Sequence, residues 1–151
     1  MRDDKDIRVI PTRSVVEGYS ALSMMNPFCD TADEFIAEMS VGIDSITTGL
    51  VTTAVRDSAL DGVDAKKGDY IGIADKTIVC ACDNRQDALL SLIKSVTESE
   101  DKEVIIVFYG KNVTEDEATV LRSRLESDYP LCDIGFIDGR QDIYDFIVSL
   151  E

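Results

Sequence analysis

The chain has 151 residues, of which 44% are hydrophobic and 30% charged, enough to build a core of its own. Fifteen basic residues against thirty acidic ones give a net charge of -15, which repels nucleic-acid phosphates and anionic membranes. No apolar run approaches the roughly 20 residues that span a bilayer, and the start, 1–6, is too acidic for a secretion signal. We therefore expect a cytoplasmic protein that binds no nucleic acid and does not insert into membranes.

Taken in chain order, the first predicted element is a short strand over Ile7–Ile10, which ends at Pro11. Ser14 with Glu17 three residues later forms a capping box, so a helix should follow. A strand this short needs a neighbour that nothing before it supplies. We therefore interpret residues 1–14 as a remnant strand and turn of an upstream lobe, and residues 15–151 as one domain.

Thr12, Arg13 and Ser14 lie between the predicted strand and the predicted helix. Backbone N–H groups and the helix dipole favour an anion at such a place. Capping of the helix by Ser14, with Arg13 in solvent, explains the same residues and is the favoured interpretation.

A second helix is predicted after Asn26-Pro27 breaks the first one. Thr31 and Glu34 repeat the capping pattern. The apolar residues that follow recur at helical spacing, at Phe35, Ile36, Met39, Ile43 and Ile46.

Two runs rich in Val, Ile, Thr and Tyr, Leu50–Val55 and Tyr70–Cys82, predict strands, with a tight turn at 74–76. The segment between them, 56–69, is charged, contains two glycines and predicts a surface loop. Arg56 beside Asp57 could form an ion pair that anchors the loop. The loop carboxylates could hold a divalent cation, but their spacing matches no calcium loop, and a solvated turn is the preferred interpretation.

The rest of the chain alternates helices and strands. Asp83 or Asn84 should cap a helix, Val104–Tyr109 should be a buried strand, and Thr114 with Glu117 should open another helix. Asp133–Ile137 reads as a further strand, so 104–137 predicts a parallel, right-handed strand–helix–strand unit. The segment 143–150 fits either a helix or a strand, and its β-forming residues favour a strand. The predicted fold class is α/β (α+β), a mixed sheet with helices packed on it.

Signatures of catalysis are scarce. The chain has no histidine, no GxSxG nucleophile elbow and no GxxxxGK[ST] phosphate loop, so no catalytic residue is predicted. The four cysteines have no CxxC spacing, and without histidine they predict no metal site. Cys80 and Cys82 share one face of a strand and are interpreted as small buried side chains. Gly139 and Gln141, around Arg140, form an isolated turn that is a weak candidate for anion binding.

Three segments together resemble a known family: PTRSVVEGYSAL at 11–22, TGLVTTAVRDSALDGVDAKKGDYIGIADKTIV at 48–79, and GRQDIYDFIVSLE at the end. They are similar to the C-terminal domain of the bacterial fatty-acid kinase A subunit. The family is one of dihydroxyacetone-kinase-like fusion proteins and is related to DegV. Two departures from the family pattern are Gly139-Arg140-Gln141, where a double glycine is usual, and Cys80-Ala81-Cys82. The resemblance implies a DegV-like C-terminal lobe without the ATP-binding domain, so ATP and Mg would belong only to that missing part.

The resemblance also implies a non-catalytic docking role. In the family, a kinase makes acyl-phosphate from a fatty acid held by a separate DegV-like fatty-acid-binding protein, which the C-terminal domain is understood to dock. We therefore expect that protein as partner, with a homodimer possible. The candidate docking residues are Arg56, Asp57, Asp61, Lys66, Lys67 and Asp69.

Two alternatives remain open. The lobe could itself bind a fatty acid or another small ligand, which requires a long apolar pocket. A weaker hypothesis is an acid–base enzyme that uses the loop carboxylates, which requires a cleft.

Overall fold

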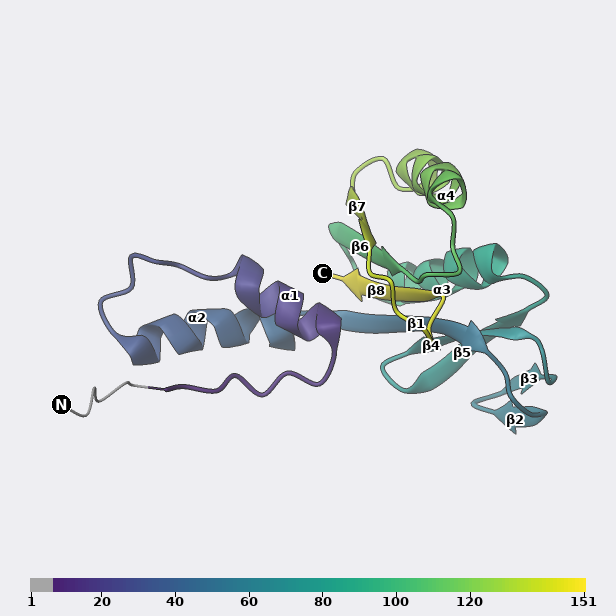
Figure 1. Cartoon of the computed structure of the whole chain (residues 1–151), viewed down its shortest axis with the longest axis horizontal. Coiled ribbons are helices and arrows are strands. Elements are labelled where there is room, and N and C mark those ends of the chain that lie inside the picture. The colour runs from purple at the N-terminus through teal and green to yellow at the C-terminus, as the bar shows by residue number, and fades with distance from the viewer. Residues whose placement is uncertain (1–6) are drawn as a thin grey trace. The chain divides into compact units, whose positions relative to one another are not determined.

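The computed structural model describes residues 7–151 and divides the chain into two compact units, one ending at Ile46 and the other spanning Thr47–Glu151 (Figure 1). The first unit contains the helices α1 (Val15–Ser23) and α2 (Ala32–Asp44). The second contains the remaining two helices and eight strands. The fold is a mixed sheet with helices packed on it, which confirms the predicted α/β class.

Both helices of the first unit begin where the capping patterns predict. The Ser14 hydroxyl accepts a hydrogen bond from the Glu17 N–H at 3.2 Å, and Thr31 Oγ1 accepts one from the Glu34 N–H at 3.2 Å. The helices approach closely at Gly42, whose carbonyl accepts a bond of 3.0 Å from the Ser20 hydroxyl. A Cβ at Gly42 would lie 3.1 Å from the Ser20 carbonyl oxygen, so the contact requires a residue without a side chain.

The predicted strand over Ile7–Ile10 is wrong, because these residues are irregular and pair with no strand. A strand needs a partner for its N–H and C=O groups, and Pro11 offers no N–H. The boundary between the two compact units falls between Ile46 and Thr47, whereas the sequence suggested a boundary after residue 14. Residues 1–6 lie outside the described part of the chain, and the assignment of 1–14 to an upstream lobe stays a prediction.

A six-stranded sheet forms the centre of the second unit, in the order β5-β4-β1-β8-β6-β7. Only the β6–β7 pair is parallel, and the other neighbours are antiparallel. The strands are β1 (Thr47–Thr53), β4 (Tyr70–Ala74), β5 (Thr77–Cys82), β6 (Val104–Tyr109), β7 (Asp133–Asp138) and β8 (Phe146–Leu150). The helices α3 (Arg85–Ser99) and α4 (Glu115–Asp128) complete the unit, capped by Asn84 and Thr114.

Several local predictions are confirmed here. β6, α4 and β7 form the parallel strand–helix–strand unit. Asp75 and Lys76, with φ of 42° and 80°, make the two-residue turn between β4 and β5 that joins strands with the natural twist. A strand rather than a helix ends the chain, but it begins at Phe146 and not at Ile143. The Ile143 carbonyl accepts a bond of 3.1 Å from the Thr52 hydroxyl.

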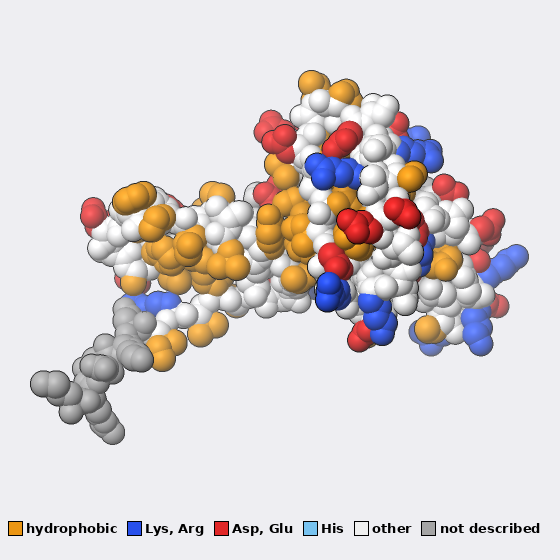
Figure 2. Space-filling view, turned by 45° about the horizontal axis from the view of Figure 1, so that its top comes forward, with side chains coloured by type: hydrophobic (Ala, Val, Ile, Leu, Met, Phe, Trp, Pro, Cys, Tyr) orange, Lys and Arg blue, Asp and Glu red, His pale blue; other side chains and the backbone are white. Residues whose placement is uncertain are grey.

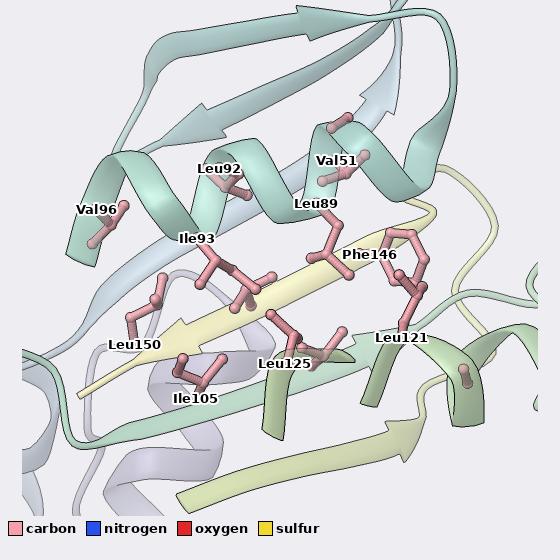
Figure 3. Close-up of a cluster of buried hydrophobic side chains, with 14 of the residues drawn as sticks. Val51, Leu89, Leu92, Ile93, Val96, Ile105, Leu121, Leu125, Phe146 and Leu150 are labelled. Carbon is pink, nitrogen blue, oxygen red and sulfur yellow. The ribbon is translucent and has the colours of Figure 1, made fainter. Parts of the chain in front are cut away.

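The core lies between the sheet and the two helices of this unit (Figure 3). Leu89 and Ile93 of α3 and Leu125 of α4 point toward the same strands, β8 and β6. Each of these three side chains is fully buried. At roughly 25 cal/mol per Å² of apolar surface removed from water, this packing is the main stabilising term of the unit.

We predict that Leu125→Ala lowers the free energy of unfolding by about 2–5 kcal/mol, because it leaves a cavity against β6 and β8. Val120→Ala on the same helix is the matched control, since Val120 is 69% exposed and should change stability by less than about 0.5 kcal/mol. Urea unfolding followed by circular dichroism measures both. Equal effects of the two substitutions would contradict this description of the core.

Candidate functional site

The segment expected to be an irregular loop contains a second, two-stranded sheet, which corrects the prediction. β2 (Ser58–Leu60) pairs antiparallel with β3 (Val63–Ala65) through a turn at Asp61 and Gly62. Both turn residues have positive φ, 56° and 79°, as a two-residue hairpin turn requires. We call residues 56–69 the β2–β3 arm. Figure 1 shows it at the end of the second unit where β1 finishes and β4 begins.

Backbone and carboxylate hydrogen bonds close the base of the arm. The Ala54 N–H donates to the Asp69 carbonyl at 2.8 Å, and the Gly68 N–H donates to the Ala54 carbonyl at 2.9 Å. The Asp57 carboxylate accepts from the Lys67 N–H at 2.7 Å, and the Asp69 carboxylate accepts from the Lys66 N–H at 2.8 Å. These two aspartates therefore hold the arm in shape.

The tip of the arm is fastened to the main sheet. The Asp61 carboxylate accepts a hydrogen bond of 3.0 Å from the backbone N–H of Ile78, in β5. At the other end of β3, the Ala65 side chain is only 3% exposed. The arm is thus held at both ends and presents its outer surface in a defined position.

Four cations lie on or beside the arm without an ion pair to any residue of 7–151. Arg56, Lys66 and Lys67 belong to the arm and are exposed, and Lys76 lies two residues from the point where Asp61 reaches β5. Every other Lys or Arg of the second unit forms an ion pair, namely Arg85, Lys94, Lys102, Lys111, Arg122, Arg124 and Arg140. Figure 2 shows basic side chains projecting at this end of the unit.

Apolar side chains accompany these cations. Val55 is 82% exposed where β1 enters the arm, and Leu60 is 54% exposed in β2. The ion pair that Arg56 and Asp57 could have formed is absent, and the Asp57 carboxylate accepts from the Lys67 backbone N–H. The arm therefore presents cations that form no ion pair within residues 7–151, together with the charges of its four aspartates, next to exposed apolar surface. Such a mixture of charged and apolar groups suits contact with another protein.

The candidates at the start of α1 take part in helix capping. Ser14 caps the helix, and the Arg13 N–H donates to the Glu17 carboxylate. A carboxylate of the chain itself thus occupies the place where an external anion would meet these N–H groups. The Thr12 N–H donates to the Ile10 carbonyl at 2.9 Å. Anion binding at 12–14 stays a prediction.

The turn with Gly139 and Gln141 fastens the ends of β6 and β7. The Gly139 N–H donates to the Tyr109 carbonyl at 3.0 Å, and the Gln141 side-chain amide donates to the Phe108 carbonyl at 2.9 Å. Arg140 between them pairs with Asp138 at 3.0 Å. These bonds give the turn a structural role, and the structure does not bring it together with the β2–β3 arm as one site.

A partly buried ion cluster, which the sequence analysis missed, joins the starts of α3 and α4 to the start of β8. Arg85 binds both carboxylate oxygens of Glu117, at 2.8 and 2.6 Å, and lies 3.4 Å from Asp145. The hydrogen bond to Glu117 is the main reason why the pKa of Arg85 is raised. Gln86 donates to the same carboxylate. Residues this far apart in the chain leave no local motif that could have revealed the cluster.

Cys80 and Cys82 of β5 pack against α3. The Cys80 thiol lies 3.5 Å from the Ala88 carbonyl of α3, and burial raises its pKa to about 11. Cys82 faces Ser91 of the same helix. At neutral pH the Cys80 side chain is therefore a neutral thiol. Both cysteines are only partly buried, whereas the sequence predicted buried side chains.

A cleft of about 630 Å³ lies between the C-terminal ends of α3 and α4. Charged residues contribute half of its lining, including Lys94, Glu98 and Asp128, and it is open to solvent. An open cleft of this kind is not the enclosed apolar pocket that fatty-acid binding requires. The alternative in which this lobe holds the fatty acid stays a prediction. Among residues 7–151, no helix is long and apolar enough to cross a membrane.

The sheet with an arm at one edge and helices on one face defines the chain as a mixed α/β domain. The family model for the C-terminal part of proteins like the A subunit of fatty acid kinase matches residues 1–151, and the chain belongs to this family. It is 35% identical over 148 residues to the protein YloV of Bacillus subtilis and 33% identical over 148 residues to an uncharacterised protein of Staphylococcus haemolyticus. Each match covers 98% of this chain but only 26% of the relative. The chain thus spans about a quarter of the length of these curated relatives.

We predict that Asp61→Ala detaches the tip of the arm from β5, because it removes the acceptor for the Ile78 N–H and places alanine at positive φ. Hydrogen exchange at Ile78 and across β2 should accelerate at least about tenfold, because losing a hydrogen bond to a charged carboxylate makes opening easier by about 1.5–3 kcal/mol. Asp61→Asn is the control, since asparagine keeps an acceptor and tolerates this φ. Unchanged exchange at Ile78 in Asp61→Ala would contradict the anchoring role.

Glu117→Ala should lower the free energy of unfolding by about 1–3 kcal/mol, because Arg85 would lose its bidentate partner in a partly buried position. Glu126→Ala is the control on the same helix, since the pair of Glu126 with Arg122 is half exposed and contributes about 0.5 kcal/mol or less. Thermal and urea unfolding measure both. The ion cluster has no stabilising role if Glu117→Ala costs no more than the control.

Proposed function

We propose that this domain is a non-catalytic docking module of a fatty-acid kinase, and that the β2–β3 arm contacts the partner protein. The partner is the fatty-acid-binding protein of the DegV-like type, which presents its bound fatty acid to a kinase domain. That kinase domain, with its ATP and Mg, lies outside this chain. The family membership supports the kinase context.

The observation that carries the proposal is the distribution of positive charge. The second unit pairs all of its cations except the four on or beside the arm, although the chain as a whole carries a charge of -15. The arm also carries four aspartates, so its cations are local positive charges on a segment of mixed charge. Cations without an intramolecular ion pair can pair with acidic groups on a partner and orient it. The exposed Val55 and Leu60 supply apolar contact beside them.

The construction of the arm also supports docking. Three of its four aspartates, Asp57, Asp61 and Asp69, accept hydrogen bonds from backbone N–H groups, so the Lys66 and Lys67 side chains are not needed to hold the fold. An arm fastened at its base and tip loses little conformational entropy when it binds. Side chains on the arm are therefore available for contact with a partner.

We predict that Arg56→Glu and Lys67→Glu each weaken binding of the cognate fatty-acid-binding protein by roughly tenfold or more. The affinity of the unchanged domain should also fall as salt is added. Isothermal titration calorimetry at two salt concentrations measures both effects. The fold should survive, because the Lys67 N–H that Asp57 binds is present in the variant.

Arg122→Glu is the control for net charge, because it makes the same charge change on α4. It should leave the affinity within about a factor of two, if its effect is only long-range and screened. Equal weakening by all three variants would show that the arm is not the contact. Absence of any complex at high micromolar concentrations would overturn the docking proposal itself.

A further inference from the structure

The two edges of the six-stranded sheet are unlike each other. At one edge, the N–H of Ile78 in β5 is bonded to the Asp61 carboxylate of the β2–β3 arm. The other edge is β7, beyond β6, and α4 packs against it. Within the part of the chain that the structure describes, no strand pairs with the far side of β7 (Figure 1).

The backbone of β7 has hydrogen-bonding groups on its outer side. The Asp133 N–H donates to the Glu103 carbonyl at 2.8 Å, and the Gly139 N–H donates to the Tyr109 carbonyl at 3.0 Å, so odd-numbered residues bond to β6. In a parallel pair the alternate residues face away. These are Ile134, Phe136 and Asp138. None of their backbone N–H and C=O groups bonds to another residue of 7–151.

β7 also lacks the usual devices that keep an edge strand from pairing. It contains no proline and no lysine, and its register with β6 runs without a bulge from Asp133 to Asp138. Ile134 and Phe136 are apolar and only partly buried. The backbone and the side chains of this edge are therefore suited to accept another strand.

The cleft described above opens at the start of this edge. Its lining includes Cys132, the residue directly before β7. Burial and, after it, the charges of Asp133 and Glu103 raise the pKa of the Cys132 thiol, so these two carboxylates lie beside the cleft. Both are exposed, and neither forms an ion pair with a residue of 7–151. Negative charge therefore stands at the start of β7.

The cleft itself is also negative. Its two lysines are already paired, Lys102 with Glu100 at 2.9 Å and Lys94 with Glu98 at 3.7 Å. Asp101 lines the cleft too and has no ion pair among the described residues. The last carbonyl groups of α3 and α4, which end at this place, add partial negative charge. The cleft is thus complementary to a cation.

The other end of β7 is close to neutral. Asp138 pairs with Arg140 at 3.0 Å, and the Arg140 side chain is 83% exposed. An added strand would therefore meet negative charge at the start of β7 and little net charge at its end. The net charge of -15 on the whole chain favours a basic segment over an acidic one.

We propose that β7 accepts an extended segment of a partner protein as an added antiparallel strand, and that a lysine or arginine at the C-terminal end of this segment enters the acidic cleft. Antiparallel pairing places that end beside Asp133. Segment residues opposite Ile134, Phe136 and Asp138 then make about six hydrogen bonds with β7. Apolar residues at alternate positions of the segment pack beside Ile134 and Phe136. This binding mode goes beyond docking at the arm and does not depend on it.

The structure limits how much of the segment can pair. Before β7, the N–H of Cys132 already donates to the Tyr129 carbonyl at 3.1 Å. After β7, Arg140 has a φ of 52°, which lies outside the strand region. The edge available for pairing is therefore 133–138, so about six residues of the segment pair and its basic end follows directly.

Three blocked peptides test the proposal on the unchanged chain. The first alternates threonine and valine over five residues and ends in two arginines. The second ends in two glutamates instead, and the third carries the two arginines at its N-terminus. The first should bind at least about tenfold more tightly than either of the others at low salt, and added salt should reduce this difference. NMR titration of the labelled chain measures the affinities, and the N–H signals of Ile134, Phe136 and Asp138 should shift.

Asp138→Pro tests the pairing of the backbone. Proline removes one outward N–H and leaves the bonds from β7 to β6, since the odd-numbered residues make them. The dissociation constant of the first peptide should rise about twofold to tenfold. Asp138→Ala is the matched control, because it also loses the ion pair with Arg140 but keeps the N–H.

Asp133→Asn tests the charge at the start of β7. It should weaken binding of the first peptide by about twofold to fivefold, as expected for the loss of an exposed ion pair. Asp64→Asn is the matched control, because it makes the same change at an exposed position of the β2–β3 arm. Circular dichroism first confirms that each variant is folded.

Several results would overturn the proposal. These are no binding of the first peptide at millimolar concentration, equal binding of all three peptides, or signal shifts confined to residues away from β7. Equal affinity of the first peptide for Asp138→Pro and Asp138→Ala would show that the β7 backbone is not the contact. None of these results bears on docking at the arm, because the arm lies at the opposite edge of the sheet.

Discussion

The close contact of α3 with the sheet is the constraint on which the second unit depends. Leu92 is fully buried above two strand residues that have no side chain, Gly49 in β1 and Gly72 in β4. A Cβ at Gly49 would lie 2.9 Å from a Leu92 methyl carbon, and a Cβ at Gly72 would lie 3.1 Å from the Leu92 Cβ. Both distances are shorter than ordinary van der Waals contacts, so the helix can approach this closely only over these glycines.

The consequences of this contact reach the arm. Because α3 packs on β4 and β5, it fixes the strand to which the tip of the arm is fastened. The same helix begins at Arg85, whose ion cluster with Glu117 ties α3 to α4. The core, the ion cluster and the arm are thus connected through α3. The position of the β2–β3 arm therefore depends on how this helix packs on the sheet.

Acidic residues in this chain do more than provide solubility. Asp57, Asp61 and Asp69 each accept a hydrogen bond from a backbone N–H, and Glu117 holds Arg85. Carboxylates that accept such hydrogen bonds stabilise turns, and their desolvation cost is small when they stay partly solvated. The arm cations are left free by this arrangement, because their neighbouring aspartates accept from the backbone instead of from them.

The sequence by itself determined the elements whose signals are local. Capping residues placed the helix starts at Ser14, Thr31 and Thr114, because N-caps depend on residues close in the chain. Runs of β-forming residues also placed β4, β5 and β7. The three segments that resemble the family were likewise recognised from the sequence alone. The prediction of a short strand at Ile7–Ile10 was wrong because a strand needs a partner strand, which can lie far away in the chain and is not visible in the local sequence.

Only the tertiary structure decided how distant residues meet. The Asp61 bond to Ile78, the Arg85 cluster and the free edge of β7 all depend on pairing between segments far apart in the chain. Within the charged segment, the sequence correctly predicted exposure, and the pair Asp61-Gly62 is a local hairpin signal that the prediction of an irregular loop overlooked. Which cations remain unpaired was equally undetermined, because ion pairing follows from three-dimensional proximity and not from composition.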